Sequence, residues 1–175
     1  MRLFFAAFPD DASCQSLSAS VQALELQPSS TYPAEKYHVT VVFLGKVPSH
    51  RVGDVRAIGE AQRIERITLR FDRWEYWPAA RAVVASASDC PEPLTRLRRG
   101  LGVGLTQREV AFDDKPLRPH ITVARKLTQA PVLPELSEFS LTFRSFSLVS
   151  SVTAPAGSIY TVVDTWPLLD TAPRR

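Results

Sequence analysis

Short apolar runs and apolar–polar alternation dominate the chain, and both patterns are typical of strands. The segment 2–8, RLFFAAF, is almost wholly apolar, whereas 67–77, ITLRFDRWEYW, alternates and predicts one half-buried strand. In all, the pattern predicts strands over residues 2–8, 37–44, 67–77, 81–88, 120–125, 138–151 and 158–168.

Three segments instead repeat apolar residues at helical spacing. The first follows a cap at Asp10 or Asp11, and the second opens at Pro48 and Ser49. The third, PEPLTRLRRGLGVGL over 91–105, begins with prolines, and its glycines are expected to weaken or end it. The three apolar stripes are Leu17, Val21 and Leu24; Val52, Val55 and Ile58; and Leu94, Leu97 and Leu101.

The order of these elements favours an α+β fold. Helices do not alternate regularly with strands, and no glycine-rich phosphate loop follows a strand, which argues against a doubly wound sheet. A weak internal duplication indicates a bilobal arrangement with two antiparallel sheets related by a pseudo-twofold axis. The length suits a single domain over 1–175 made of two intimately packed lobes, with a frayed tail at about 170–175.

Composition narrows the class and the compartment. Apolar residues make up 45% of the chain and charged residues 22%, as expected of a soluble globular protein. The net charge of +3 is compatible with a phosphate-bearing ligand, although most surface arginines are simply solvated. Cys14 and Cys90 form neither a metal spacing nor a disulfide framework. With no signal sequence and no membrane-spanning segment, we expect a cytoplasmic protein.

Two strands share an unusual pattern, a histidine two residues before a threonine. The segments KYHVTVVFLG, 36–45, and RPHITVARK, 118–126, contain two of the three histidines in the chain. Because residues i and i+2 of a strand point to the same side, His38 and Thr40 are expected to share one face. His120 and Thr122 are expected to do the same, with the intervening apolar residues facing the core.

Two imidazoles and two hydroxyls suit phosphodiester hydrolysis. A neutral imidazole can take a proton from water while a protonated one gives a proton to a leaving alkoxide. Threonine hydroxyls can donate to the non-bridging phosphate oxygens, where charge accumulates. Arg125 would add a positive fork, but it is an odd number of residues from His120. Only a bulge or the strand end would therefore bring it onto the same face.

A metal site is the rival use of paired histidines. Such a site would require a third ligand, often a carboxylate. Asp113 and Asp114 are close to His120 in sequence, but they belong to a polar loop. Hydrolysis by a metal therefore ranks below general acid–base catalysis, and no cofactor is expected.

The two motifs, HVTVVFLG and PHITVAR, resemble the paired motifs of the two-histidine (2H) phosphoesterase superfamily. The opening RLFFAAF and the trailing Arg125 resemble its RNA 2′,3′-cyclic phosphodiesterase branch, also called the 2′-5′ RNA ligases. The resemblance runs over nearly the whole chain and implies a central cleft between the lobes. It implies hydrolysis of 2′,3′-cyclic phosphates to 2′-phosphomonoesters, possible reverse ligation, and binding of RNA ends or nucleotides. We also expect a monomer, and no membrane partner because no segment is long enough to span a bilayer.

The resemblance also implies a role for each residue. His38 would be the general acid toward the leaving 3′ oxygen, and His120 the general base that activates water. Thr40, Thr122 and Arg125 would hold the phosphate.

Several points stay open from the sequence. Phe5 matches a family aromatic residue near the cleft that would stack on the terminal base, with a core phenylalanine as the alternative. The segment YPAEKYH and Lys46 depart from the family pattern at the rim, which affects substrate choice. RNA, a 2′-5′ oligonucleotide and an ADP-ribose cyclic phosphate all remain as substrates. The alternative function is a nucleotide- or RNA-end-binding protein of the same fold without turnover.

Overall fold

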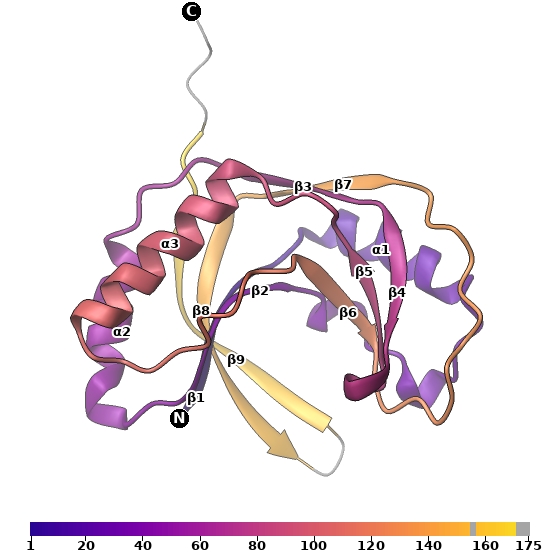
Figure 1. The fold of residues 1–175 in the computed structure, drawn as a ribbon, viewed down its shortest axis with the longest axis horizontal. Coiled ribbons are helices and arrows are strands. Elements are labelled where there is room, and N and C mark those ends of the chain that lie inside the picture. Colours follow the sequence, from indigo (N-terminus) through magenta and orange to yellow (C-terminus); the bar gives the residue numbers. More distant parts are fainter. Residues whose placement is uncertain (155–156, 171–175) are drawn as a thin grey trace, which may run out of the picture.

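Antiparallel strands form two sheets, which we describe from a computed structural model over residues 1–154 and 157–170 (Figure 1). The larger sheet has the strand order β4-β5-β6-β2-β1-β8-β9, and β3 and β7 form the smaller one. The strands are β1 (Arg2–Ala7), β2 (Val39–Lys46), β3 (Ile67–Phe71), β4 (Arg73–Trp77), β5 (Ala82–Ser86), β6 (His120–Ala124), β7 (Phe139–Phe143), β8 (Ser145–Ala154) and β9 (Gly157–Pro167). The predicted α+β class is confirmed.

The large sheet has two similar halves that meet at its centre. From the centre, β2-β1-β8 runs outward on one side and β6-β5-β4 on the other. The two central strands, which carry the two histidine motifs, meet at Val39 and Ile121. The two halves expected as separate sheets are thus joined at the place where the motifs lie.

Three helices complete the fold: α1 (Asp11–Gln22), α2 (Val52–Glu60) and α3 (Glu92–Gln107). The side chain of Asp10 caps α1 by accepting a hydrogen bond from the Ser13 amide at 2.8 Å, which selects one of the two predicted caps. Figure 1 shows α2 and α3 together on one side and α1 on the other. No helix in the described ranges is both long and apolar enough to cross a bilayer.

Of the two effects predicted for the glycines of the third helix, weakening it or ending it, the second is wrong. Helix α3 continues through Gly100, Gly102 and Gly104 as far as Gln107. A Cβ atom at Gly104 would lie 2.7 Å from the Cγ2 atom of Ile58 on α2. Close packing of the two helices therefore uses the missing side chain, and this packing outweighs the low helix propensity of glycine.

Two predicted strands are each divided between the two sheets. The segment 67–77 breaks at Asp72 into β3 and β4, and 138–151 breaks at Arg144 into β7 and β8. Buried positions are odd-numbered in β3 and include Phe71, whereas Trp74 is the buried position that follows in β4. A one-residue change of phase in the alternation moves the chain from one sheet to the other.

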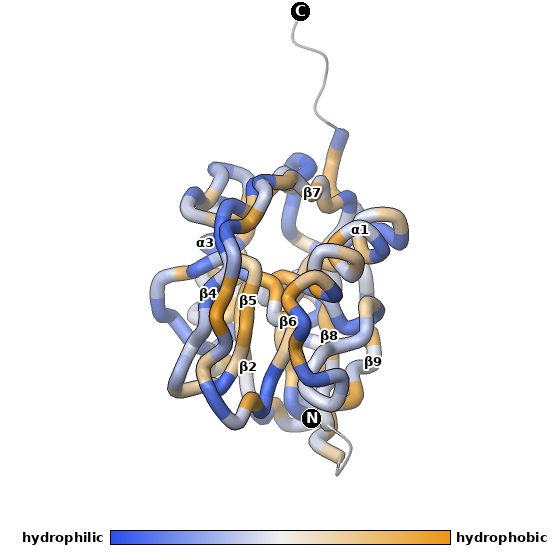
Figure 2. The backbone as a smooth tube through the Cα atoms, turned by 90° about the vertical axis from the view of Figure 1, so that its right-hand side faces the viewer, coloured by the Kyte–Doolittle hydropathy of each residue, from blue (hydrophilic) through white to orange (hydrophobic). Residues whose placement is uncertain are grey.

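A continuous core lies on one side of the large sheet. It includes Val39, Val41, Ile121 and Val123 from the two central strands, together with the buried leucines of α3. Figure 2 shows apolar residues concentrated on the strands and hydrophilic residues on most of the loops. Of the tail expected to fray, 170–175, all but Asp170 lies outside the described residues.

Candidate active site

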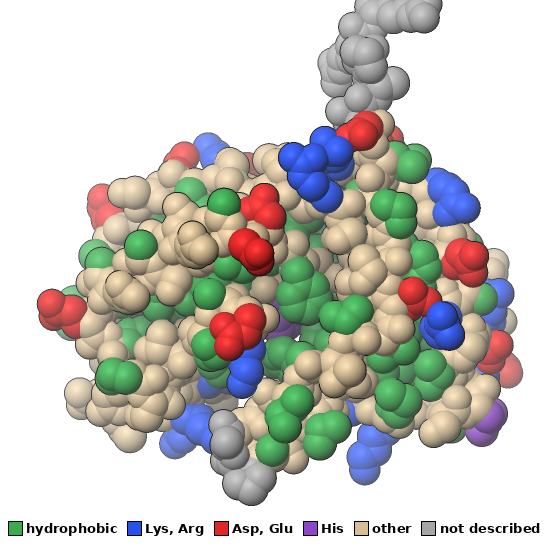
Figure 3. All heavy atoms as spheres, turned by 180° about the vertical axis from the view of Figure 1, so that it is seen from behind, with side chains coloured by type: hydrophobic (Ala, Val, Ile, Leu, Met, Phe, Trp, Pro, Cys, Tyr) green, Lys and Arg blue, Asp and Glu red, His purple; other side chains and the backbone are tan. Residues whose placement is uncertain are grey.

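A cleft of about 670 Å³ lies on the side of the two central strands, β2 and β6, that faces away from the hydrophobic core. In the view of Figure 3, histidine atoms are visible at the foot of a hollow lined by apolar side chains. The cleft is lined by all five residues that the sequence motifs singled out for acid–base catalysis and phosphate binding: His38, Thr40, His120, Thr122 and Arg125. Strand parity explains the arrangement, because Val39, Val41, Ile121 and Val123 are at most 1% exposed on the core side.

Arg125 reaches the cleft through the strand irregularity that its odd offset requires. Opposite β5, Thr122 pairs with Val84 but Ala124 pairs with Val83, so β6 contains one extra residue there. This bulge reverses the parity after Thr122, and β6 ends at Ala124. The backbone amide of Arg125 then donates to the carbonyl of Ser30 at 2.8 Å, which fixes the position of the arginine.

Both histidine rings are anchored in the same way. Nδ1 of His38 lies 2.7 Å from the carbonyl oxygen of Lys36, and Nδ1 of His120 lies 2.7 Å from that of Arg118. Since a carbonyl oxygen can only accept, Nδ1 carries the proton in each neutral ring. Nε2 is consequently left as the acceptor, which can take a proton in the cleft.

His38 lies among aromatic side chains. Its ring centroid is 5.3 Å from those of Phe4 and Tyr160 and 5.6 Å from that of Phe8. Burial in this apolar site lowers the pKa of His38 from 6.5 to about 4, against the opposing effect of the Lys36 carbonyl. The charges of His120 and Arg125 lower this pKa further. In the free protein His38 is therefore neutral at pH 7.

We expect His38 to make the protein sensitive to acid. Between pH 6.5 and about 4 the unfolded chain binds a proton at this residue that the folded protein does not. The free energy of unfolding therefore decreases as the pH is lowered through this range. Replacement of His38 by glutamine should reduce this decrease, taken between pH 7 and pH 4.5, by at most about 2 kcal/mol, because part of the ring faces the cleft. Urea unfolding at both pH values measures this difference. Equal losses in wild type and His38→Gln would contradict it, and His50→Gln, on the surface, is the control.

His120 has a different, more polar surrounding. The Trp77 ring centroid lies 4.4 Å from that of His120, and Trp77 Nε1 donates to Glu75 Oε2 at 3.0 Å. Burial lowers the pKa of His120 below its ordinary value, opposed by the Arg118 carbonyl. The charges of Arg125 and Arg118 lower it further, while that of Glu75 raises it.

Base stacking by Phe5 is not compatible with the structure. Phe5 is 0% exposed and lies in the core, where its ring centroid is 6.3 Å from that of Phe146 and 6.0 Å from that of Trp166. The core alternative therefore holds. Its neighbour Phe4 points to the other face and lines the cleft beside His38.

The sequence reading missed the polar surroundings of His120. Glu75 and Trp77 belong to the predicted strand 67–77 and were not singled out, because a half-buried alternating strand is ordinarily structural. The phase change after Phe71 is the signal that marks a separate strand there. Asp113 and Asp114, weighed as metal ligands, do not line the cleft. Among the residues that the structure describes, no three His, Cys, Asp or Glu side chains are grouped as a metal site.

Comparisons with known proteins identify the family of this chain. The model of the 2′-5′ RNA ligase superfamily matches residues 9–154. An RNA 2′,3′-cyclic phosphodiesterase of Thermus thermophilus is 31% identical over 183 residues, which cover 96% of this chain and 90% of that protein. An Escherichia coli protein of the same name is 26% identical over 77% of each chain.

Solved structures of similar proteins have the same fold. The Thermus thermophilus protein TT0787 has a TM-score of 0.84 at 28% identity and covers 98% of this chain and 100% of that one. Escherichia coli LigT complexed with 3′-AMP has a TM-score of 0.82 at 26% identity, over 95% of this chain and 97% of that one. Because the family model covers most of the chain and a relative above 30% identity spans nearly all of it, this protein belongs to the 2′-5′ RNA ligase superfamily.

Proposed function

We propose that this protein hydrolyses 2′,3′-cyclic phosphates at RNA ends or on nucleotides to 2′-phosphomonoesters, without a metal. The observation that carries the proposal is the pair of imidazoles, each anchored through Nδ1, that line one cleft from the two halves of the sheet. Two relatives that bear the name RNA 2′,3′-cyclic phosphodiesterase support it. Structures of Escherichia coli LigT with 3′-AMP, ATP and NADP⁺ add support for a nucleotide ligand.

The reaction needs two proton transfers. His120 would take a proton from water through Nε2 as the water oxygen forms a bond to phosphorus. The bond between phosphorus and the 3′ oxygen breaks, and His38 would give its proton to that oxygen. The product is a 2′-phosphomonoester, and the two rings have exchanged protonation states.

This role requires a protonated His38, although its pKa of about 4 makes the free ring neutral at pH 7. A bound phosphodiester anion favours the imidazolium through its charge and so raises the pKa. Binding of the substrate would therefore help to protonate the general acid. Thr40, Thr122 and Arg125 would hold the phosphate oxygens, where negative charge increases in the transition state.

The charge of the cleft favours an RNA end over a small cyclic phosphate. Among the residues that the structure describes, five cationic side chains and no carboxylate line the cleft, and these cations are Arg2, Lys36, Arg81, Arg125 and Lys126. The ion pairs within the described residues involve other lysines and arginines. A cyclic phosphate carries one negative charge, whereas an oligonucleotide offers a further phosphate at each linkage.

The same arrangement would also act as a ligase. If a 5′ hydroxyl took the place of water, His120 would remove its proton, and the product would be a 2′-5′ phosphodiester. Because a catalyst accelerates both directions of a step, cleavage of that linkage to the cyclic phosphate would use the same two histidines in exchanged roles. We include reversible 2′-5′ ligation in the proposal on this ground.

In this proposal the protein is a monomer in the cytoplasm and consists of one domain over 1–175. A hydrophobic core shared by both halves of the sheet supports the single domain. Cys14 and Cys90 are free, as in a reducing compartment.

An oligonucleotide ending in a 2′,3′-cyclic phosphate tests the proposal. We expect a 2′-phosphate as product, identified by chromatography against 2′- and 3′-phosphate standards, and equal turnover with and without EDTA. A cyclic mononucleotide of the same base is the matched substrate, and its kcat/KM should be lower and less dependent on salt.

Each part of the proposal has its own contradicting result. A 3′-phosphate product would contradict the assigned leaving group. Activity that is lost in EDTA and restored by a divalent ion would contradict the metal-free mechanism. Equal kcat/KM for both substrates at low salt would contradict the preference for RNA ends.

A further inference from the structure

The two histidines sit in related strands but have opposite surroundings. Around His38 the ring neighbours are three aromatic side chains, Phe4, Phe8 and Tyr160. His120 has one aromatic neighbour, Trp77, and lies opposite the polar Ser86 on β5. A pseudo-twofold arrangement alone would make the two sites alike, so the difference is specific to each half.

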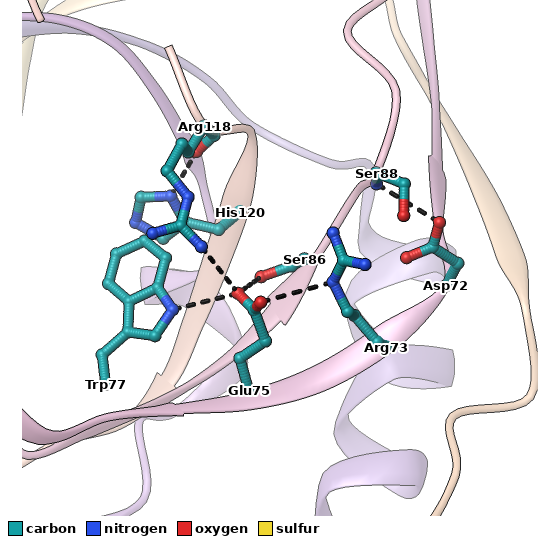
Figure 4. A network of polar contacts seen from close by, with 8 residues as sticks. All are labelled: Asp72, Arg73, Glu75, Trp77, Ser86, Ser88, Arg118 and His120. Atoms are coloured by element: carbon teal, nitrogen blue, oxygen red, sulfur yellow. Dashed lines mark hydrogen bonds and ion pairs between the residues drawn. The ribbon is translucent and has the colours of Figure 1, made fainter. Parts of the chain in front are cut away.

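Glu75 is the centre of the polar group beside His120 (Figure 4). Its Oε2 atom accepts hydrogen bonds from Ser86 Oγ at 2.7 Å, from Trp77 Nε1 at 3.0 Å and from Arg118 Nη2 at 3.3 Å. Its Oε1 atom lies 3.3 Å from Arg73 Nε. One carboxylate thus binds groups from β4, from β5 and from the segment that leads into β6.

Three of these groups also contact or hold His120. The ring of Trp77 lies against the imidazole at 4.4 Å between centroids. The carbonyl of Arg118 anchors Nδ1 at 2.7 Å, and the guanidinium of Arg118 lies 4.9 Å from the centroid of the Trp77 ring. Ser86 pairs with His120 in the register of the two strands. The contacts that hold the imidazole therefore all connect to Glu75.

Glu75 is ionised at neutral pH. Burial opposes its charge, but the hydrogen bonds from Ser86 and Trp77 and the charges of Arg118 and Arg73 outweigh this effect, so its pKa lies below the ordinary value. The charged groups that act on His120 are then Arg125 and Arg118, which disfavour an imidazolium, and Glu75, which favours it. The side chain of Glu75 is 25% exposed, so solvent screens its charge only in part.

We propose that Glu75 is a positioning residue for His120: it fixes the Trp77 ring and the Arg118 segment against the imidazole, and its charge stabilises the imidazolium. This inference rests on the proposed function, in which His120 takes a proton from water and becomes an imidazolium. Glu75 does not touch the substrate in this assignment and acts only through its neighbours. In the part of the chain that the structure describes, the charged groups that act on the pKa of His38 are His120 and Arg125, and no carboxylate is among them.

Glu75→Gln tests the proposal, because it removes the charge and keeps an oxygen that can accept from Trp77. We expect the NMR titration midpoint of His120 in the substrate-free protein to move to lower pH. We also expect kcat/KM to fall about tenfold, mainly through kcat, since the phosphate contacts are unchanged. The matched control is Glu65→Gln, because Glu65 is also partly exposed and paired with an arginine, Arg96, and is not among the groups acting on His120.

The outcomes separate this proposal from the proposed function. A His120 midpoint that is the same in wild type and Glu75→Gln overturns the positioning role, even if activity falls. A midpoint that moves equally in Glu65→Gln overturns it as well. If Glu75→Gln does not fold, Glu75→Met removes the same charge with a side chain of similar length, with the same expected direction and the same contradicting result. Full activity of His120→Ala would contradict the proposed function instead.

Discussion

Replacing either His38 or His120 by alanine is expected to lower kcat for a 2′,3′-cyclic phosphate by about 10²–10⁴-fold, the usual contribution of general acid–base catalysis. Each ring is anchored through Nδ1 and contributes one proton transfer at Nε2, so neither can replace the other. The rate is measured with a cyclic-phosphate oligonucleotide, and far-UV circular dichroism establishes that each variant is folded.

The third histidine provides the control for this experiment. His50 is exposed in a short 3₁₀ helix, Ser49–Arg51, and does not line the cleft. His50→Ala should therefore retain wild-type kcat. If His38→Ala and His120→Ala both turn over at the wild-type rate, the paired mechanism is wrong. Tight binding of nucleotides by the wild type without hydrolysis of any cyclic phosphate would favour the alternative of a binding protein without turnover.

Replacing Arg125 by glutamine is expected to lower kcat/KM by about 10²–10³-fold, the typical loss when one group that stabilises transition-state charge is removed. The β6 bulge brings this side chain to the cleft, and its amide is bonded to Ser30. Glutamine keeps much of the length and loses the positive charge. Steady-state kinetics with the oligonucleotide measure the effect, and inorganic phosphate tested as an inhibitor should bind more weakly to the variant.

Arg99→Gln is the matched control for this second prediction. Arg99 is exposed on α3 and lies outside the cleft, so loss of the same charge there should leave kcat/KM unchanged. A value of kcat/KM for Arg125→Gln within about twofold of wild type would mean that Arg125 does not bind the phosphate in the transition state. An equal loss in both variants would indicate a general effect of net charge.

Local periodicity made much of this site predictable. In each motif the residues at i and i+2 must share a face, whatever strand lies beside them. His38, Thr40, His120 and Thr122 therefore appear on the cleft side as expected. The same reasoning showed that Arg125 required a bulge or a strand end, and the structure has both.

The wrong predictions lie where the apolar pattern does not distinguish the two faces of a strand, or where its alternation shifts by one residue. Strand β1 is buried on both faces, so its sequence contains no alternation that distinguishes Phe4 from Phe5. In 67–77 and 138–151 the phase of alternation changes at Asp72 and Arg144, and a continuous strand was predicted across each change.

The sequence by itself determined the strand-rich α+β class, the two motifs and the shared face of their histidines and threonines, because these depend on backbone geometry over a few residues. Only the tertiary structure decided which strands became neighbours: β2 beside β6, and β4 beyond β5. These pairings place His38 among aromatic rings and His120 beside Glu75 and Trp77. Such contacts join residues that lie far apart along the chain, and no local pattern specifies them.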